Sequence, residues 1–131
     1  MAVTPQELLR YAESLLQESG ELRLRNAAGR AFYAAYHSCL PLYGRLDSGP
    51  ETREGTHQRI IRLFSEYHGP DESISRRIRA LGVMYRQVRD LRSKADYEIE
   101  SDFTKGEAET VLRTVKSIVE RTAELGNVTL G

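Results

Sequence analysis

Residues 25–42 constrain the fold more than any other stretch of this chain, because they combine two different faces at helical spacing. One face is an apolar stripe made mostly of small side chains, at Ala28, Ala31, Phe32, Ala35, Cys39 and Leu42. Spacings of three and four residues predict an amphipathic helix, and small side chains let a second helix approach closely. Beside this stripe runs a polar line at the same spacing, formed by Asn26, Arg30, Tyr33 and His37. A polar line next to a tight helix contact indicates either a ligand site or a buried polar cluster.

Helical periodicity continues through the rest of the chain, and no alternating strand pattern of useful length occurs. We predict helices from the cap Thr4 to the stop at Ser19-Gly20, from about Glu21 to Tyr43, from about Thr56 to Tyr67, from the cap Asp71 to about Ile99, and from the cap Thr104 to Leu125. The glycine-rich residues 44–55 are predicted to form the longest loop. The expected fold is an all-α, up-and-down bundle of four to five helices in a single domain that spans residues 1–131.

Composition excludes several classes of function. Lys plus Arg and Asp plus Glu both total 19, so a zero formal net charge gives no bulk argument for nucleic-acid binding. One cysteine and three histidines without ligand spacing predict no disulfide, no metal site and no cofactor. No apolar run is long enough for a membrane span and no signal-peptide pattern is present, so we expect a cytoplasmic protein without membrane contact.

The fourth predicted helix carries a second polar line, formed by Tyr85, Arg89, Arg92 and Asp96. Arg92 and Asp96 are one helical turn apart, so they can form an ion pair. If the second and fourth helices are neighbours, both lines face one cleft, which gathers Arg30, Tyr33, His37, Arg89, Arg92, Asp96 and Tyr97. Guanidinium groups hold phosphate, tyrosine rings stack on bases, and histidine transfers protons, so this set suits an anionic ligand.

A purely structural interpretation explains the same residues. Arg30 and Asp96 can pair with each other between two helices, with Tyr33 and His37 covering the pair. The residue spacing alone leaves both interpretations open.

Three short segments resemble the HEPN family of higher eukaryote and prokaryote nucleotide-binding domains. Residues 30–37 (RAFYAAYH) resemble the family stretch R-A-(Y/F)-Y-A-x-(Y/F)-H. His57 and Phe64 lie in a segment similar to H-x-x-(V/I)-x-x-x-F, and residues 92–97 (RSKADY) resemble R-x-x-A-D-Y. The segments occur in the family's order, and the helix pattern matches over nearly the whole chain.

The resemblance implies a HEPN-like helical bundle that forms a homodimer. It also implies a role in prokaryotic defence or toxin–antitoxin systems, often beside a small nucleotidyltransferase-like partner protein. Many members of the family are metal-independent ribonucleases with the signature R-x(4–6)-H in the C-terminal half. No histidine follows Arg92 in this sequence, so the resemblance points away from that nuclease branch.

Three hypotheses about function follow. The favoured one is a non-catalytic module that binds a nucleotide, RNA or a nucleotidyltransferase-type partner between the second and fourth helices. In it, Arg30 and Arg92 hold phosphate, Asp96 orients an arginine, and Tyr33 or Tyr97 stacks. An alternative is a metal-independent endoribonuclease with His37 as general acid and base and Arg30 as phosphate stabiliser. The remaining alternative is a helical dimer or scaffold whose polar cluster is only structural.

Overall fold

The computed structural model describes residues 3–17, 20–46 and 54–130, and all regular elements in these ranges are α-helices. The prediction of an all-α helical bundle is therefore confirmed. The helices are α1 (Pro5–Leu16), α2 (Glu21–Leu46), α3 (Thr56–Ser65), α4 (Glu72–Tyr97) and α5 (Lys105–Leu125).

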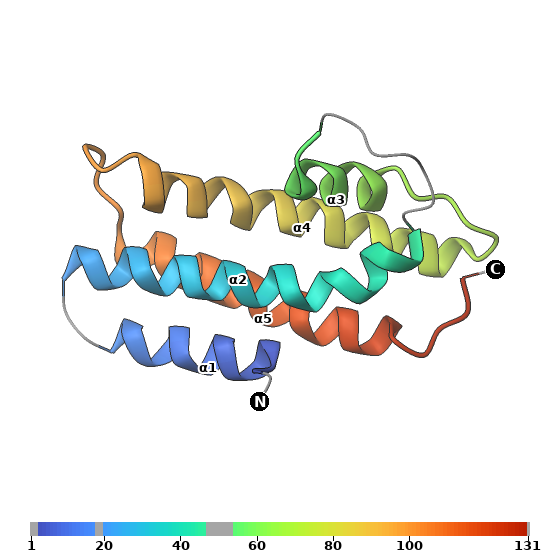
Figure 1. Ribbon diagram of the computed structural model, residues 1–131, viewed down its shortest axis with the longest axis horizontal. Coiled ribbons are helices and arrows are strands. Elements are labelled where there is room, and N and C mark those ends of the chain that lie inside the picture. The colour runs from blue at the N-terminus through green and yellow to red at the C-terminus, as the bar shows by residue number, and fades with distance from the viewer. Residues whose placement is uncertain (1–2, 18–19, 47–53, 131) are drawn as a thin grey trace.

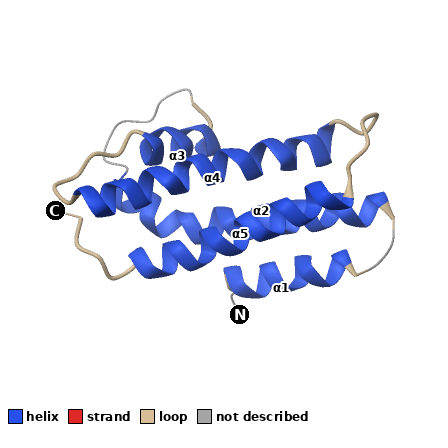
Figure 2. Ribbon diagram, turned by 180° about the vertical axis from the view of Figure 1, so that it is seen from behind, coloured by secondary structure: helices blue, strands red, loops and turns tan. Residues whose placement is uncertain are grey.

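Helix α2 lies at the centre of the fold and contacts the four other described helices (Figure 1). The long helices α1, α2, α4 and α5 run up and down, so that each is antiparallel to the next long helix in the sequence (Figures 1 and 2). The short α3 packs against α4, on the side of α4 that faces away from α1. Polar groups on α2, α3 and α4 can therefore meet on one side of the bundle.

The small-residue stripe of α2 explains this central position. Ala28, Ala31 and Ala35 are fully buried, and Phe32, Cys39 and Leu42 are buried with them. Side chains of this size keep interhelical distances short, so one helix can pack against several neighbours. The sequence prediction for this face is confirmed.

Side-chain caps begin three of the helices where the sequence predicts them. Thr4 and Glu7 form a reciprocal capping box on α1, and Thr104 and Glu107 form the same box on α5. Asp71 accepts a hydrogen bond from the amide of Ile74 at the start of α4. These short-range bonds satisfy backbone amides that have no partner within the helix.

Several predicted helix ends are wrong by a few residues. Helix α2 continues through Pro41 and past Tyr43 to Leu46, whereas α3 stops at Ser65 and α4 stops at Tyr97. Pro41 removes one backbone hydrogen bond, and burial of the next residue, Leu42, keeps the last turns of α2 packed. Residues 47–53 of the predicted loop, and Ser19 of the predicted stop after α1, lie outside the described residues.

None of the described helices is both long enough and apolar enough to cross a membrane.

Candidate functional site

A cleft of about 500 Å³ opens where α2, α3 and α4 meet. Its walls are polar and aromatic, and they are formed by Arg25, Asn26, Gly29, Arg30, Phe32, Tyr33 and Tyr36 from α2, Thr56 and His57 from α3, and Arg92 and Asp96 from α4. Part of each polar line therefore faces one cleft, Asn26, Arg30 and Tyr33 from α2 and Arg92 and Asp96 from α4, and α3 adds a third wall.

Arg92 is held from several directions at this cleft. Its Nε lies 2.9 Å from Oδ2 of Asp96, so the predicted ion pair within α4 is confirmed. The guanidinium carbon also lies 5.2 Å from the ring centroid of Phe32 and 5.7 Å from that of Tyr97. An arginine held between aromatic rings loses little further rotamer freedom when it binds an anion, because its orientation is already restricted. The orientation of the Arg92 guanidinium group is thus restricted by Asp96, Phe32 and Tyr97.

Arg30 lies on the opposite wall of the cleft and is more exposed to solvent than Arg92. Its guanidinium carbon lies 6.0 Å from the ring centroid of Tyr33, and its side chain is exposed. Within the described residues, neither Arg30 nor Arg89 has a carboxylate partner. Asp96 pairs with Arg92, so the interhelical pair of Arg30 with Asp96 that the structural interpretation requires is not formed. Arg30 therefore contributes uncompensated positive charge to the cleft.

Aromatic rings extend from α2 across to α3. Tyr33 is 47% exposed, and the ring of His37 meets it edge-on at 4.4 Å. Tyr36 contacts His37 at 5.2 Å on one side and His57 at 5.0 Å on the other. The half-exposed Tyr33 offers a ring face at the cleft, which is the surface that planar ligand groups stack on.

His57 lines the cleft although it was not among the predicted site residues, and the same is true of Phe32 and Tyr36. The side chain of His57 does not cap α3, because the cap residue is Gly55 and, within the described residues, no side chain bonds to the first amides of the helix. Its Nδ1 instead lies 2.7 Å from the hydroxyl of Tyr85. The sequence did contain a signal for the position of His57. Its helical spacing from Ile60, Ile61 and Phe64 places it on the inward face of α3.

Burial and nearby charges shift the pKa values of His57 and Tyr85. Burial is the largest cause that lowers the pKa of His57 from its ordinary value of 6.5, and the charges of Arg92 and Arg89 lower it further. Burial also raises the pKa of Tyr85 well above its ordinary range. Tyr85 is fully buried, so this member of the α4 polar line points into the core, and His57 meets its hydroxyl.

Only some of the seven predicted site residues line the cleft. The cleft is lined by four of them, Arg30, Tyr33, Arg92 and Asp96. Tyr97 contacts the cleft only by packing against Arg92, and Arg89 acts only through its charge on His57 and Tyr85. His37 lines a separate cavity of about 310 Å³ between the start of α1 and the C-terminal parts of α2 and α5. Arg30 and His37 lie two helical turns apart, which takes them to different cavities.

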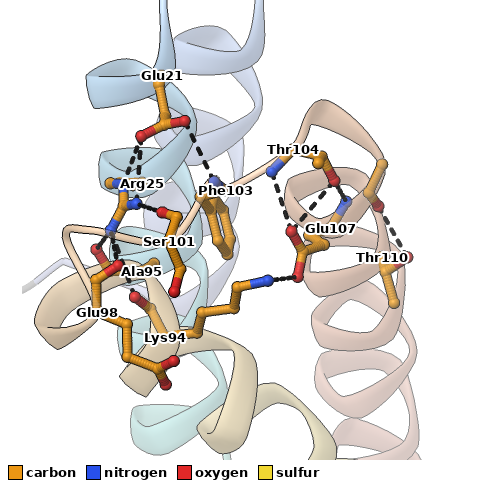
Figure 3. A network of polar contacts seen from close by, with 11 residues as sticks. Glu21, Arg25, Lys94, Ala95, Glu98, Ser101, Phe103, Thr104, Glu107 and Thr110 are labelled. Atoms are coloured by element: carbon orange, nitrogen blue, oxygen red, sulfur yellow. Dashed lines mark hydrogen bonds and ion pairs between the residues drawn. The ribbon is translucent and has the colours of Figure 1, made fainter.

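The C-terminal end of α4, next to Asp96 and Tyr97, is held by the buried Arg25 (Figure 3). Nη1 of Arg25 donates to the carbonyl oxygens of Ala95 at 2.9 Å and Glu98 at 3.2 Å, and Nη2 donates to the carbonyl of Ser101. Its Nε donates to Glu21, which in turn accepts a hydrogen bond from the amide of Phe103. One side chain of α2 therefore satisfies carbonyls that the end of α4 leaves without helical partners.

We expect the His57 environment to make stability depend on pH. The folded-state pKa of His57 is below 6.5, so the unfolded chain binds a proton there that the folded chain does not. This contribution to the free energy of unfolding is present above 6.5 and is lost as the pH falls from 6.5 to the folded-state pKa. Urea unfolding across this window measures the loss, which we expect to be smaller in His57→Gln.

The carboxylates titrate in a separate range. The pKa values of Glu72 and Glu107 are lowered from 4.5, chiefly by hydrogen bonds from Arg79 and Lys94 respectively. Their contributions are lost as the pH falls below 4.5, whereas the loss from His57 begins as the pH falls below 6.5. Equal losses in the wild type and His57→Gln between neutral pH and the carboxylate range would contradict the assignment.

Comparison with protein-family models, with curated proteins and with solved structures finds no match to this chain. Over the described ranges, no group of three or more His, Cys, Asp or Glu side chains is arranged to hold a metal ion. The functional argument therefore rests on the geometry of the cleft.

Proposed function

We propose that the cleft between α2, α3 and α4 binds a phosphate-bearing ligand, either a nucleotide or a single-stranded segment of RNA, without cleaving it. The observation that carries this proposal is Arg92, which is held between Phe32 and Tyr97 and lines a cleft of about 500 Å³ opposite Arg30. A guanidinium group with restricted motion binds phosphate with little entropic cost, and a second arginine across the cleft increases the local positive potential.

The ring of Tyr33 supports a nucleotide over a simple inorganic anion. Tyr33 lines the cleft and is half exposed, so a base can stack on its ring while the phosphate contacts the arginines. Stacking of a base on an aromatic side chain contributes roughly 1–3 kcal/mol and tolerates any base. We therefore expect affinity for nucleotides to exceed affinity for inorganic phosphate.

The geometry gives no support to the nuclease alternative based on Arg30 and His37. A general base and a phosphate-stabilising cation must reach the same substrate group, within hydrogen-bond distance of it. The His37 ring packs against Tyr33 and Tyr36 and lines a different cavity from Arg30. The homodimer, the nucleotidyltransferase-like partner and the defence role stay predictions from the family resemblance.

We expect Arg92→Ala to weaken binding of a fluorescein-labelled single-stranded RNA about 10- to 100-fold, because a charge-assisted hydrogen bond contributes roughly 1.5–3 kcal/mol. Fluorescence anisotropy at low salt measures the affinity, with unlabelled AMP and inorganic phosphate as competitors. The salt dependence should also become shallower, by about 0.7 for each phosphate that the variant no longer neutralises.

Arg86→Ala is the matched control, because Arg86 is an exposed arginine of the same helix that does not line the cleft. It removes the same charge, and we expect its affinity to match that of the wild type closely. Wild-type protein that binds neither RNA nor AMP, or equal losses in the two variants, would overturn the proposal. The structural alternative predicts that no variant changes any binding.

A further inference from the structure

The hydrogen bond between His57 and Tyr85 joins the cleft to the buried core. His57 lines the cleft, Tyr85 is fully buried, and 2.7 Å separates Nδ1 of the imidazole from the phenol oxygen. The bond can be made in two ways when both groups are neutral. Either the tyrosine hydroxyl donates to Nδ1, or Nδ1 carries the proton and donates to the hydroxyl oxygen.

Burial of the phenol distinguishes the two arrangements. Over the described residues, the hydrogen bond of the Tyr85 hydroxyl is the one with His57. If Nδ1 donated, the hydroxyl hydrogen would be buried without an acceptor, which costs roughly 1–3 kcal/mol. The hydroxyl therefore donates to Nδ1, and the ring proton lies on Nε2.

The groups around His57 also oppose a second proton on the ring. Helix α4 places Arg89 and Arg92 near it, and both positive charges disfavour the imidazolium form. Helix α2 contributes the rings of Phe32 and Tyr36, at 5.1 Å and 5.0 Å from the His57 ring. The carboxylate that lines the same cleft, Asp96, is paired with Arg92.

We propose that Tyr85 is a positioning residue that holds His57 as a neutral imidazole with its proton on Nε2, so that His57 presents a hydrogen-bond donor to the ligand in the cleft. This inference rests on the proposed function and extends it. Nδ1 is occupied by Tyr85, and Nε2 has no hydrogen-bond partner among the described residues. The ring nitrogen left for a ligand is therefore a donor without a net charge.

A donor at this position restricts the chemistry of the ligand. The group that meets His57 must carry a lone pair, such as a phosphate oxygen or a base carbonyl, and a hydroxyl can bind there only as an acceptor. In this tautomer His57 has no free lone pair, so it cannot take a proton from a ribose hydroxyl. Although the cleft contains histidine, arginine and tyrosine side chains, His57 therefore cannot serve as the general base of a nuclease.

Nitrogen-15 NMR of the histidine rings in the free protein tests the tautomer directly. In the wild type at neutral pH, we expect the His57 signals of a protonated Nε2 and an unprotonated Nδ1. Tyr85→Phe removes the donor and keeps the ring, so both tautomers should appear and Nε2 should become partly unprotonated. A wild-type ring protonated on Nδ1, or on both nitrogens, would overturn the inference.

RNA binding tests the donor, using the same labelled RNA as above. We expect His57→Leu to weaken binding about 2- to 10-fold, because one neutral hydrogen bond contributes roughly 0.5–1.5 kcal/mol. His57→Gln should restore most of the affinity, since its amide nitrogen supplies a donor at a similar distance from the backbone. Equal losses in the two variants would contradict a donor role.

The two experiments separate the inference from the function on which it rests. A wild-type protein that binds no RNA or nucleotide overturns the proposed function and the contact of His57 with a ligand. The NMR result then still decides whether Tyr85 sets the tautomer. An Nδ1-protonated ring in a protein that does bind RNA overturns the inference alone.

Discussion

Arg25→Met is expected to lower the free energy of unfolding by about 3 kcal/mol, because it removes the donor for the buried bond to the Ala95 carbonyl and for the part-buried bonds to two further carbonyls. Arg25 donates to the carbonyls of Ala95, Glu98 and Ser101, and it pairs with Glu21 (Figure 3). Methionine keeps much of the aliphatic volume and removes every donor. Urea unfolding followed by far-ultraviolet circular dichroism measures the difference.

Two further variants test the role of the Arg25 hydrogen bonds. Arg25→Lys keeps the charge, but a single ammonium cannot reproduce a fork that reaches separate carbonyls, so we expect an intermediate loss. Arg10→Met is the control, because Arg10 is an exposed arginine of α1 and such changes stay within about 0.5 kcal/mol. If Arg25→Met were as stable as Arg10→Met, Arg25 would not anchor α4.

Substitution of Arg25 should also affect the cleft. The carbonyls that it holds lie on both sides of Asp96 and Tyr97 in the sequence, and these two residues contact Arg92. Without their anchor, the last turn of α4 should open more often, and its amide hydrogens should exchange with solvent faster. Arg25 is therefore a structural residue whose effect on ligand binding is indirect.

Gly82→Ala is expected to destabilise the protein by about 1–2 kcal/mol, although alanine is the better helix former. A methyl group at Gly82 would lie 2.7 Å from the backbone nitrogen of Ser65 and 3.1 Å from Cβ of Phe64. Overpacking of this kind costs roughly 1–3 kcal/mol, which exceeds the gain of about 1 kcal/mol in helix propensity. The nearest atom, Oγ of Ser65 at 2.5 Å, can rotate away, but the backbone nitrogen of Ser65 and Cβ of Phe64 are fixed by α3 itself.

Gly44→Ala provides the matched control, because Gly44 lies in the last turns of α2 and nothing surrounds the position of its missing methyl group. There the gain in helix propensity should act alone and stabilise the protein by up to about 1 kcal/mol. Opposite signs for the two substitutions in thermal or urea unfolding would support a tight contact between α3 and α4. Stabilisation by both would contradict it.

The Gly82 contact matters for the cleft because it sets the distance between α3 and α4. Helix α3 carries His57, and α4 carries Tyr85 and Arg92. A displaced α3 should therefore lengthen the bond between His57 and Tyr85 as well as lower stability. A glycine in the middle of a helix costs about 1 kcal/mol relative to alanine, which is consistent with a close helix contact at Gly82.

Local features of the sequence were sufficient for the elements of this fold. Capping boxes at Thr4 and Thr104 and the ion pair of Arg92 with Asp96 join residues within one or two helical turns. Their geometry follows from the helix itself, so residue spacing predicts them. The same holds for the buried stripe of α2, whose period is that of the helix. Helix ends were less predictable, since packing of Leu42 carries α2 past Pro41.

The sequence by itself therefore determined the helices, their buried faces and the polar lines that flank them. Only the tertiary structure decided which polar groups meet: His57 of α3 joins Tyr85 and Arg92 of α4, whereas His37 is directed to another cavity. It also assigned Arg25 to the end of α4. Contacts within a helix follow from its repeat, whereas contacts between helices depend on how whole helices pack, which no short stretch of sequence specifies. The polar line of α2 accordingly forms one wall of the cleft, and α3 and α4 complete it.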